Sequence, residues 1–181
     1  MKVLELGSCE EKIKILETLD GTDNPEILEK IILKLDDDDI QVRGEAFSSL
    51  VLNENKISNF LIKSLNSASK NIRGFASLVL ANRNEITAIP EIIKLAKDEH
   101  SMVRSCAIGA LGYLRAQEAK EIFLESLFDS DLEVRKSALQ GVIDLNITIS
   151  ENKIKEIIKE KDPEIEKLFS ELKKYSGPEG I

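Results

Sequence analysis

One short signature occurs four times at a nearly constant interval, and it narrows the folds that this chain can adopt. An arginine follows an aliphatic residue, an alanine comes three residues later and another aliphatic residue four after that, as in Val134-Arg135, Ala138 and Val142. The four arginines stand at positions 43, 73, 104 and 135, at intervals of 30, 31 and 31 residues. A period of this length is typical of a repeat protein, in which one supersecondary unit stacks on the next.

Each period predicts two helices. The aliphatic, alanine and aliphatic positions of the signature are four residues apart, so they share one face of a helix, which we call the inner helix. Apolar residues twelve and eight positions before each arginine, such as Ile31 and Leu35, predict a preceding outer helix. The residue four before each arginine is the predicted N-cap of the inner helix: Asp39, Ser69, His100 and Asp131, with Ser101 as the alternative to His100.

The fold predicted from this pattern is an all-α, right-handed superhelix of about five helical pairs after an N-terminal half-repeat, in one domain over residues 1–181. The half-repeat covers 8–20, with no outer helix before it. Four full repeats are predicted at 25–53, 56–83, 87–115 and 117–146. Residues 151–175 are predicted to form a capping unit, since they are rich in Lys and Glu and a terminal unit exposes one face to solvent.

Composition and charge exclude several classes of function. The formal net charge of −8 disfavours binding to nucleic acid or to a membrane surface, since such partners need clustered Lys and Arg. Cys9 and Cys106 form no CxxC pair and His100 is the only histidine, so the sequence predicts neither a disulfide framework nor a metal site. No signal peptide, membrane span, cofactor motif or catalytic constellation is recognisable. We therefore expect a cytoplasmic protein that is not an enzyme and holds no cofactor.

The signature, written as Asp-x-x-x-x-Val-Arg-x-x-Ala-x-x-x-Leu, resembles the HEAT repeat. Within that superfamily it is similar to the short HEAT-like repeats named after phycobilisome lyases, and the Ala-x-x-Ala-Leu-Gly segment at 107–112 carries this likeness. The resemblance covers residues 8–175 and implies an α-solenoid whose inner helices line a concave surface. It also implies a structural ladder between adjacent repeats, formed by Asp37, Arg43, Asp98, Arg104, Asp129 and Arg135.

Arg73 departs from the ladder pattern. An aspartate stands six residues before each of the other three arginines, whereas Ser67 occupies this position before Arg73. We therefore expect Arg73 to be the freest of the four arginines. A second interpretation, in which all four arginines line a groove that binds an anion, also stays open.

The inner surface is the predicted binding surface. Residues one, four, five, eight and nine positions after each arginine point away from the buried stripe, and small residues alternate there with apolar ones. The leading hypothesis is a non-catalytic scaffold or adaptor that binds a protein or peptide on this concave surface. The predicted partner-binding residues are Phe47, Val51, Leu78, Ile108, Tyr113, Arg73 and Lys136. The competing interpretation is that some of them, especially Phe47 and Ile108, pack between adjacent inner helices.

Two other functions stay open. The resemblance to the lyase-type repeats implies a bilin-lyase-like factor that handles a chromophore, with Arg73, Lys136 and Tyr113 as the inward-facing polar candidates. The other function is that of a structural subunit in a larger assembly, which self-association would reveal.

Overall fold

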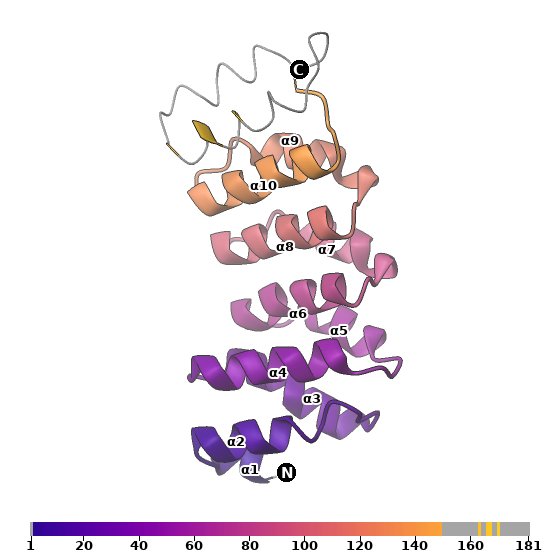
Figure 1. The fold of residues 1–181 in the computed structure, drawn as a ribbon, viewed down its shortest axis with the longest axis vertical. Coiled ribbons are helices and arrows are strands. Elements are labelled where there is room, and N and C mark those ends of the chain that lie inside the picture. The colour runs from indigo at the N-terminus through magenta and orange to yellow at the C-terminus, as the bar shows by residue number, and fades with distance from the viewer. Residues whose placement is uncertain (1, 150–162, 164–165, 168–169, 171–181) are drawn as a thin grey trace.

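The computed structural model describes residues 2–149 together with residues 163, 166, 167 and 170. The predicted capping unit at 151–175 therefore lies almost wholly outside the described residues. Over 2–149 the chain forms ten α-helices and three short 3-10 helices, and they stack in two layers (Figure 1). The prediction of an all-α solenoid is confirmed. Among the described helices, none combines the length and the hydrophobicity needed to cross a membrane.

The helices alternate between the two layers along the chain. The inner helices run side by side from the N-terminal to the C-terminal end of the stack, as Figure 1 shows: α2 (Cys9–Leu16), α4 (Ile40–Leu52), α6 (Lys70–Asn82), α8 (Ser101–Tyr113) and α10 (Leu132–Asp144). The outer helices lie behind them: α1 (Lys2–Leu6), α3 (Pro25–Leu33), α5 (Ser58–Ser64), α7 (Ile89–Leu95) and α9 (Lys120–Ser126). The 3-10 helices are η1 (Lys34–Asp36), η2 (Ile86–Ala88) and η3 (Gln117–Ala119).

The first unit contains a helix that the repeat pattern does not predict. Because α1 precedes α2, the expectation that no outer helix comes before residue 8 was wrong. The helix is five residues long and buries only Leu4, so it has no periodic apolar stripe that a sequence pattern could reveal.

Three of the four predicted N-caps of the inner helices are present. The side chains of Asp39, Ser69 and Asp131 accept hydrogen bonds from backbone N–H groups in the first turn of α4, α6 and α10. Each such cap stabilises its helix by ~1 kcal/mol. His100 stands at the N-cap position of α8, but its side chain caps no backbone N–H.

The core lies between the two layers and repeats from unit to unit. The signature residues of α8, Val103, Ala107 and Leu111, are fully buried. The alanine allows the neighbouring helices to approach closely, and a larger side chain there would overpack the core by ~1–3 kcal/mol. Since each unit buries its stripe only against its neighbours, stability is approximately a sum of nearest-neighbour terms.

Candidate functional site

The arginines of the inner helices connect adjacent repeats. Nε and Nη2 of Arg73 donate to the two carboxylate oxygens of Asp98, at 2.7 and 2.9 Å. Arg104 binds Asp129 in the same bidentate way, at 2.8 and 2.7 Å. In both pairs the acid lies in the loop before the next inner helix. Burial opposes ionisation of both aspartates, but the arginines outweigh it and hold their pKa values below the ordinary range.

The remaining terminal nitrogen of each arginine, Nη1, holds the loop before its own helix. In Arg43 it donates to the backbone carbonyls of Asp37 and Asp38, at 2.7 and 3.1 Å. The same pair of contacts recurs in the next three repeats. Each arginine therefore supports its own turn, and Arg73 and Arg104 also clamp the following repeat.

Lysines take the place of an arginine at the first junction. Asp37 accepts hydrogen bonds from Nζ of Lys12 in α2 and of Lys34, both at 2.9 Å. Lys12 stands 31 residues before Arg43, so it occupies the arginine position of the first unit. Burial would raise the pKa of Asp37, but the hydrogen bonds from the two lysines outweigh it and lower the pKa to about 2.

The expectation that Arg73 is free was wrong. That expectation assumed that the acid partner of Arg73 belongs to the same repeat. The partner is Asp98, which belongs to the following repeat. The side chain of Arg73 is only 11% exposed. Because Arg73 and Arg104 are each bound to a carboxylate, the interpretation of four arginines lining an anion groove is also wrong. By the same register, the acid that Ser67 replaces would be the partner of Arg43 in the preceding repeat, whereas Arg73 binds only the backbone carbonyl of Ser67.

The predicted apolar groove is largely closed. Ile108 is fully buried, so its prediction as a partner-binding residue was wrong. The physical reason is its register, since the position four after each arginine is fully buried in three inner helices, at Ser77, Ile108 and Leu139. The half-buried members of the predicted set, which pack against the core, are Phe47, Val51 and Leu78. The competing interpretation, packing between inner helices, therefore holds for Ile108.

The exposed row of the inner surface lies nine positions after the arginines. Leu52 and Tyr113 are 65% and 64% exposed, and Asn82 and Asp144 occupy the same position in their repeats and are exposed as well. Tyr113 is the aromatic member of this row. It is also the one residue of the predicted partner-binding set that is exposed.

Tyr113 borders two adjoining hollows. One, of about 400 Å³, lies between α8 and α10, where the structure brings Tyr113 and Lys136 together. The other, of about 520 Å³, extends from Tyr113 to the loop after α6. We call the lining residues the Tyr113 site: Asn82, Asn84, Gly109, Gly112, Tyr113, Arg115, Lys136, Ser137, Gln140, Gly141 and Asp144.

Comparison with known proteins places the signature in a family. A family profile described as HEAT repeats matches residues 58–143, and one described as a HEAT repeat associated with sister chromatid cohesion matches residues 15–44. The chain belongs to the HEAT-repeat superfamily. The matched stretches of this HEAT-repeat chain contain all four signature arginines. The finer resemblance to the phycobilisome-lyase type stays a prediction.

Solved structures share the fold with this HEAT-repeat chain. The crystal structure of an engineered protein gives a TM-score of 0.56 at 17% identity, over 92% of each chain. A computationally designed armadillo repeat protein for modular peptide recognition gives 0.55 at 17% identity, over 92% of this chain and 94% of that one. A structure from work on TOG–tubulin binding specificity gives 0.51 at 15% identity, over 87% and 78%. At such identities the likeness concerns the fold alone.

One curated relative is an enzyme. The epoxyqueuosine reductase of Staphylococcus aureus (strain NCTC 8325 / PS 47) is 35% identical over 74 residues, which are 40% of this chain. The match covers only 20% of the length of that relative. The HEAT-repeat chain therefore spans a small part of the enzyme.

The described part of the HEAT-repeat chain contains no group of three or more His, Cys, Asp or Glu side chains that could hold a metal ion. Burial raises the pKa of Cys106 to about 11, so its thiol stays protonated and unreactive at neutral pH. His100 belongs to the ladder, since its Nδ1 lies 3.3 Å from a carboxylate oxygen of Asp98.

Most polar residues of the Tyr113 site were not predicted from the sequence. Asn82, Gln140 and Asp144 stand at inner positions five and nine, but apolar residues were favoured over them. Register was the signal that could have found them, because position nine is exposed in each of the inner helices α4 to α10 and position four is not.

Proposed function

We propose that this HEAT-repeat chain is a non-catalytic scaffold or adaptor that binds an extended peptide segment of a partner protein at the Tyr113 site. The observation that carries the proposal is the 64% exposure of Tyr113 beside two hollows on the inner surface. An aromatic side chain exposed on a concave surface is typical of a contact that a partner buries.

The form of the hollow favours an extended segment. Gly109 and Gly112 carry no side chain in the hollow, so a polypeptide backbone can come close to α8. Asn82 and Gln140 carry amide groups, which both donate and accept hydrogen bonds as a peptide backbone requires. One solved structure of similar fold is a design for modular peptide recognition, which is consistent with this use of the inner surface.

The charges of the site constrain the partner. Arg115 and Lys136 line the hollows together with Asp144, and Lys136 Nζ lies 2.9 Å from Glu133. Both signs are therefore present. We expect a segment with an aromatic or aliphatic residue for contact with Tyr113 and without a strong net charge.

The alternative functions find less support in the geometry. A bilin-lyase-like role needs inward-facing polar groups for the chromophore, and one of its three candidates, Arg73, is bound to Asp98. The match to epoxyqueuosine reductase covers a fifth of that enzyme, so its reaction is not transferred to this chain. The cytoplasm stays the expected location on the sequence grounds given above.

Selection of peptides from a random phage-displayed library, with the whole chain as bait, tests the proposal. The affinities of the selected peptides are then measured by titration calorimetry for the unmodified chain and for Tyr113→Ala, Gly109→Leu and Phe128→Ala. Phe128 is the matched control, because it is an aromatic residue 42% exposed and outside the Tyr113 site. We expect the first two variants to lose about tenfold or more in affinity and the control to bind unchanged.

Gly109→Leu is informative because it fills the hollow without removing a contact. A Cβ at Gly109 would meet nothing within 4 Å, and leucine favours a helix more than glycine does. Peptides that bind both variants as tightly as the unmodified chain would contradict the proposal. Light scattering of the same samples measures self-association, and association that persists in both variants would favour the structural-subunit alternative.

A further inference from the structure

Among the junctions within residues 2–149, the ladder is interrupted between α4 and α6. Lys12, Arg73 and Arg104 each bind an aspartate of the following unit. Arg43 forms no ion pair with any residue in 2–149, and its guanidinium hydrogen bonds run only to two carbonyls of its own loop. The repeat formed by α3 and α4 and the repeat formed by α5 and α6 are therefore not joined by an ion pair to aspartate, whereas the junctions on either side are.

Ser67 explains the missing ion pair. It occupies the loop position that Asp98 and Asp129 hold in the next two repeats. Ser67 Oγ accepts the backbone N–H two residues ahead at 3.2 Å, and each of the two aspartates accepts the equivalent N–H at 2.9 Å. The turn is therefore the same in all three repeats. What is missing is the carboxylate that would reach Arg43.

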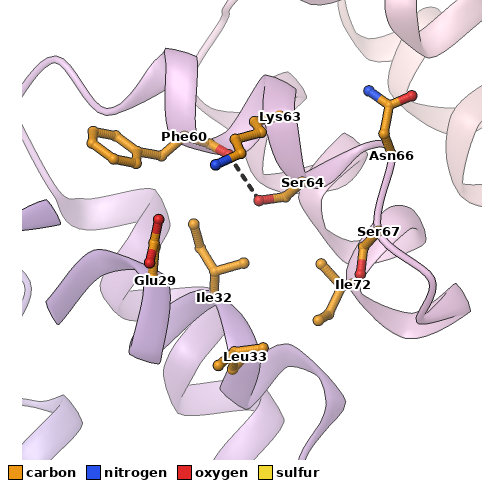
Figure 2. Close-up of a pocket in the computed structure, with 9 residues that line it drawn as sticks. All are labelled: Glu29, Ile32, Leu33, Phe60, Lys63, Ser64, Asn66, Ser67 and Ile72. Atoms are coloured by element: carbon orange, nitrogen blue, oxygen red, sulfur yellow. Dashed lines mark hydrogen bonds between the residues drawn. The ribbon is translucent and has the colours of Figure 1, made fainter. Parts of the chain in front are cut away.

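A cavity lies at the same end of this junction. It is a surface pocket of about 350 Å³, lined by α3 and by α5, which also contact each other directly (Figure 2). Ile32 and Leu33 line it from one repeat, and Phe60 and Ser67 line it from the other. Because solvent reaches the pocket, the apolar side chains that line it bury less surface between the two repeats than they would in a closed junction.

The opposite edge of the junction is firmly held. Arg83, which follows α6, donates to the backbone carbonyls of Leu50, Asn53 and Asn55 at the end of α4, with distances of 3.1 Å to Leu50 and 2.9 Å to Asn55. Its side chain is 9% exposed. The junction is thus fixed at the C-terminal ends of the two inner helices. At their N-terminal ends it has no arginine–aspartate pair within 2–149 and is bridged by an exposed hydrogen bond, from Asn71 Nδ2 to Asp36 Oδ1 at 2.7 Å.

We infer that this junction is a hinge. The part up to α4 and the part from α5 to α10 rotate relative to each other about the Arg83 contacts, and the gap between Arg43 and Ser67 opens and closes. Because α4 and α6 are neighbours in the inner layer, the rotation changes the curvature of the inner surface (Figure 1). The Tyr113 site lies wholly on α6 to α10, so the hinge moves a bound segment relative to the exposed Leu52 of α4.

Hydrogen exchange of the whole chain, measured by mass spectrometry, tests the hinge. Ser67→Asp supplies the missing carboxylate, and Asp98→Ser removes the carboxylate from the next junction while keeping the turn, so the two variants are matched controls. In the unmodified chain we expect amides in 60–73 to exchange faster than amides in 91–104. Ser67→Asp should slow exchange in 60–73 by roughly 3- to 10-fold, and Asp98→Ser should accelerate exchange in 91–104 by a similar factor.

Distance distributions between two spin labels provide a second measurement. Labels at Glu26 in α3 and Asn59 in α5, both exposed, are introduced in a Cys9→Ser and Cys106→Ala background. We expect a broad distribution that narrows when Ser67→Asp is added. Equal exchange at the two junctions of the unmodified chain would overturn the hinge. A Ser67→Asp variant that changes neither the exchange nor the width of the distribution would also overturn it.

Discussion

Gly112 of α8 lies against Gly141 of α10, so closely that a Cβ on Gly112 would stand 3.6 Å from the Cα of Gly141. The two inner helices meet through these glycines at the base of the Tyr113 site. One turn earlier in α8, Gly109 has empty space where its side chain would be. Glycine therefore serves two purposes in this hollow, a close helix contact and an open floor.

Gly141→Ala and Gly109→Ala should have opposite effects on stability. A Cβ at Gly141 would collide with the ring of Phe123, a fully buried side chain, so we expect a loss of about 1–3 kcal/mol. Gly109→Ala has room, and the higher helix propensity of alanine should add about 0.5–1 kcal/mol. Urea denaturation measures both changes. If the two variants shift the midpoint in the same direction, packing does not distinguish the two glycines.

Asp129→Asn should weaken the junction between α8 and α10. The amide can keep the contact with the N–H of Asp131, but it no longer offers two charged oxygens to Arg104. We expect a loss of about 1–3 kcal/mol in the free energy of unfolding. A double-mutant cycle with Arg104→Gln measures the pair, and the double variant should cost less than the sum of the single ones. Additive costs would mean that the two side chains do not stabilise each other.

The repeat was predictable because core packing imposes it on every unit. Each inner helix needs a small residue at the position of Ala107 and aliphatic residues one turn on either side, and that need leaves a local pattern in the sequence. The acid partner of Arg73 left no such pattern. Both the loop before its own helix and the loop before the next carry polar residues, and only the stacking of the repeats decides that Asp98 is within reach.

The candidate site was predictable in part, for a related reason. Ile108 and Tyr113 lie on the same helix and were both assigned to the inner surface. Which of the two is buried depends on where α6 and α10 lie beside α8, and this is a property of the helix packing rather than of either residue. α1 escaped prediction because one buried leucine does not make a periodic pattern.

Stability should fall as the pH drops from about 4 toward 2, because the pKa of Asp37 is about 2 in the fold and ordinarily 3.8. The folded-state pKa is the lower one, so the stabilisation is complete above the ordinary value and is lost as the pH falls through the folded value. The lowered pKa values of Asp98 and Asp129 act in the same direction. Urea midpoints measured from acidic to neutral pH follow this change.

Asp37→Asn is the control for the acid response. It should flatten the dependence of the midpoint on pH and cost roughly 1–2 kcal/mol at neutral pH, since Lys12 and Lys34 lose their shared carboxylate. An acid response as steep in this variant as in the unmodified chain would show that other carboxylates cause it.

Ile108→Ala and Tyr113→Ala should separate stability from binding. Ile108 is fully buried, so its truncation should leave a cavity and cost about 2–4 kcal/mol. Tyr113 is 64% exposed, so its truncation should change stability by no more than about 0.5 kcal/mol while it weakens the peptides selected on the inner surface. Thermal melts followed by circular dichroism measure the first effect, and titration calorimetry of the folded variants measures the second. The assignment of Ile108 to the core and of Tyr113 to the binding surface would be wrong in either of two cases. One is an Ile108→Ala variant as stable as the unmodified chain, and the other is a Tyr113→Ala variant that unfolds.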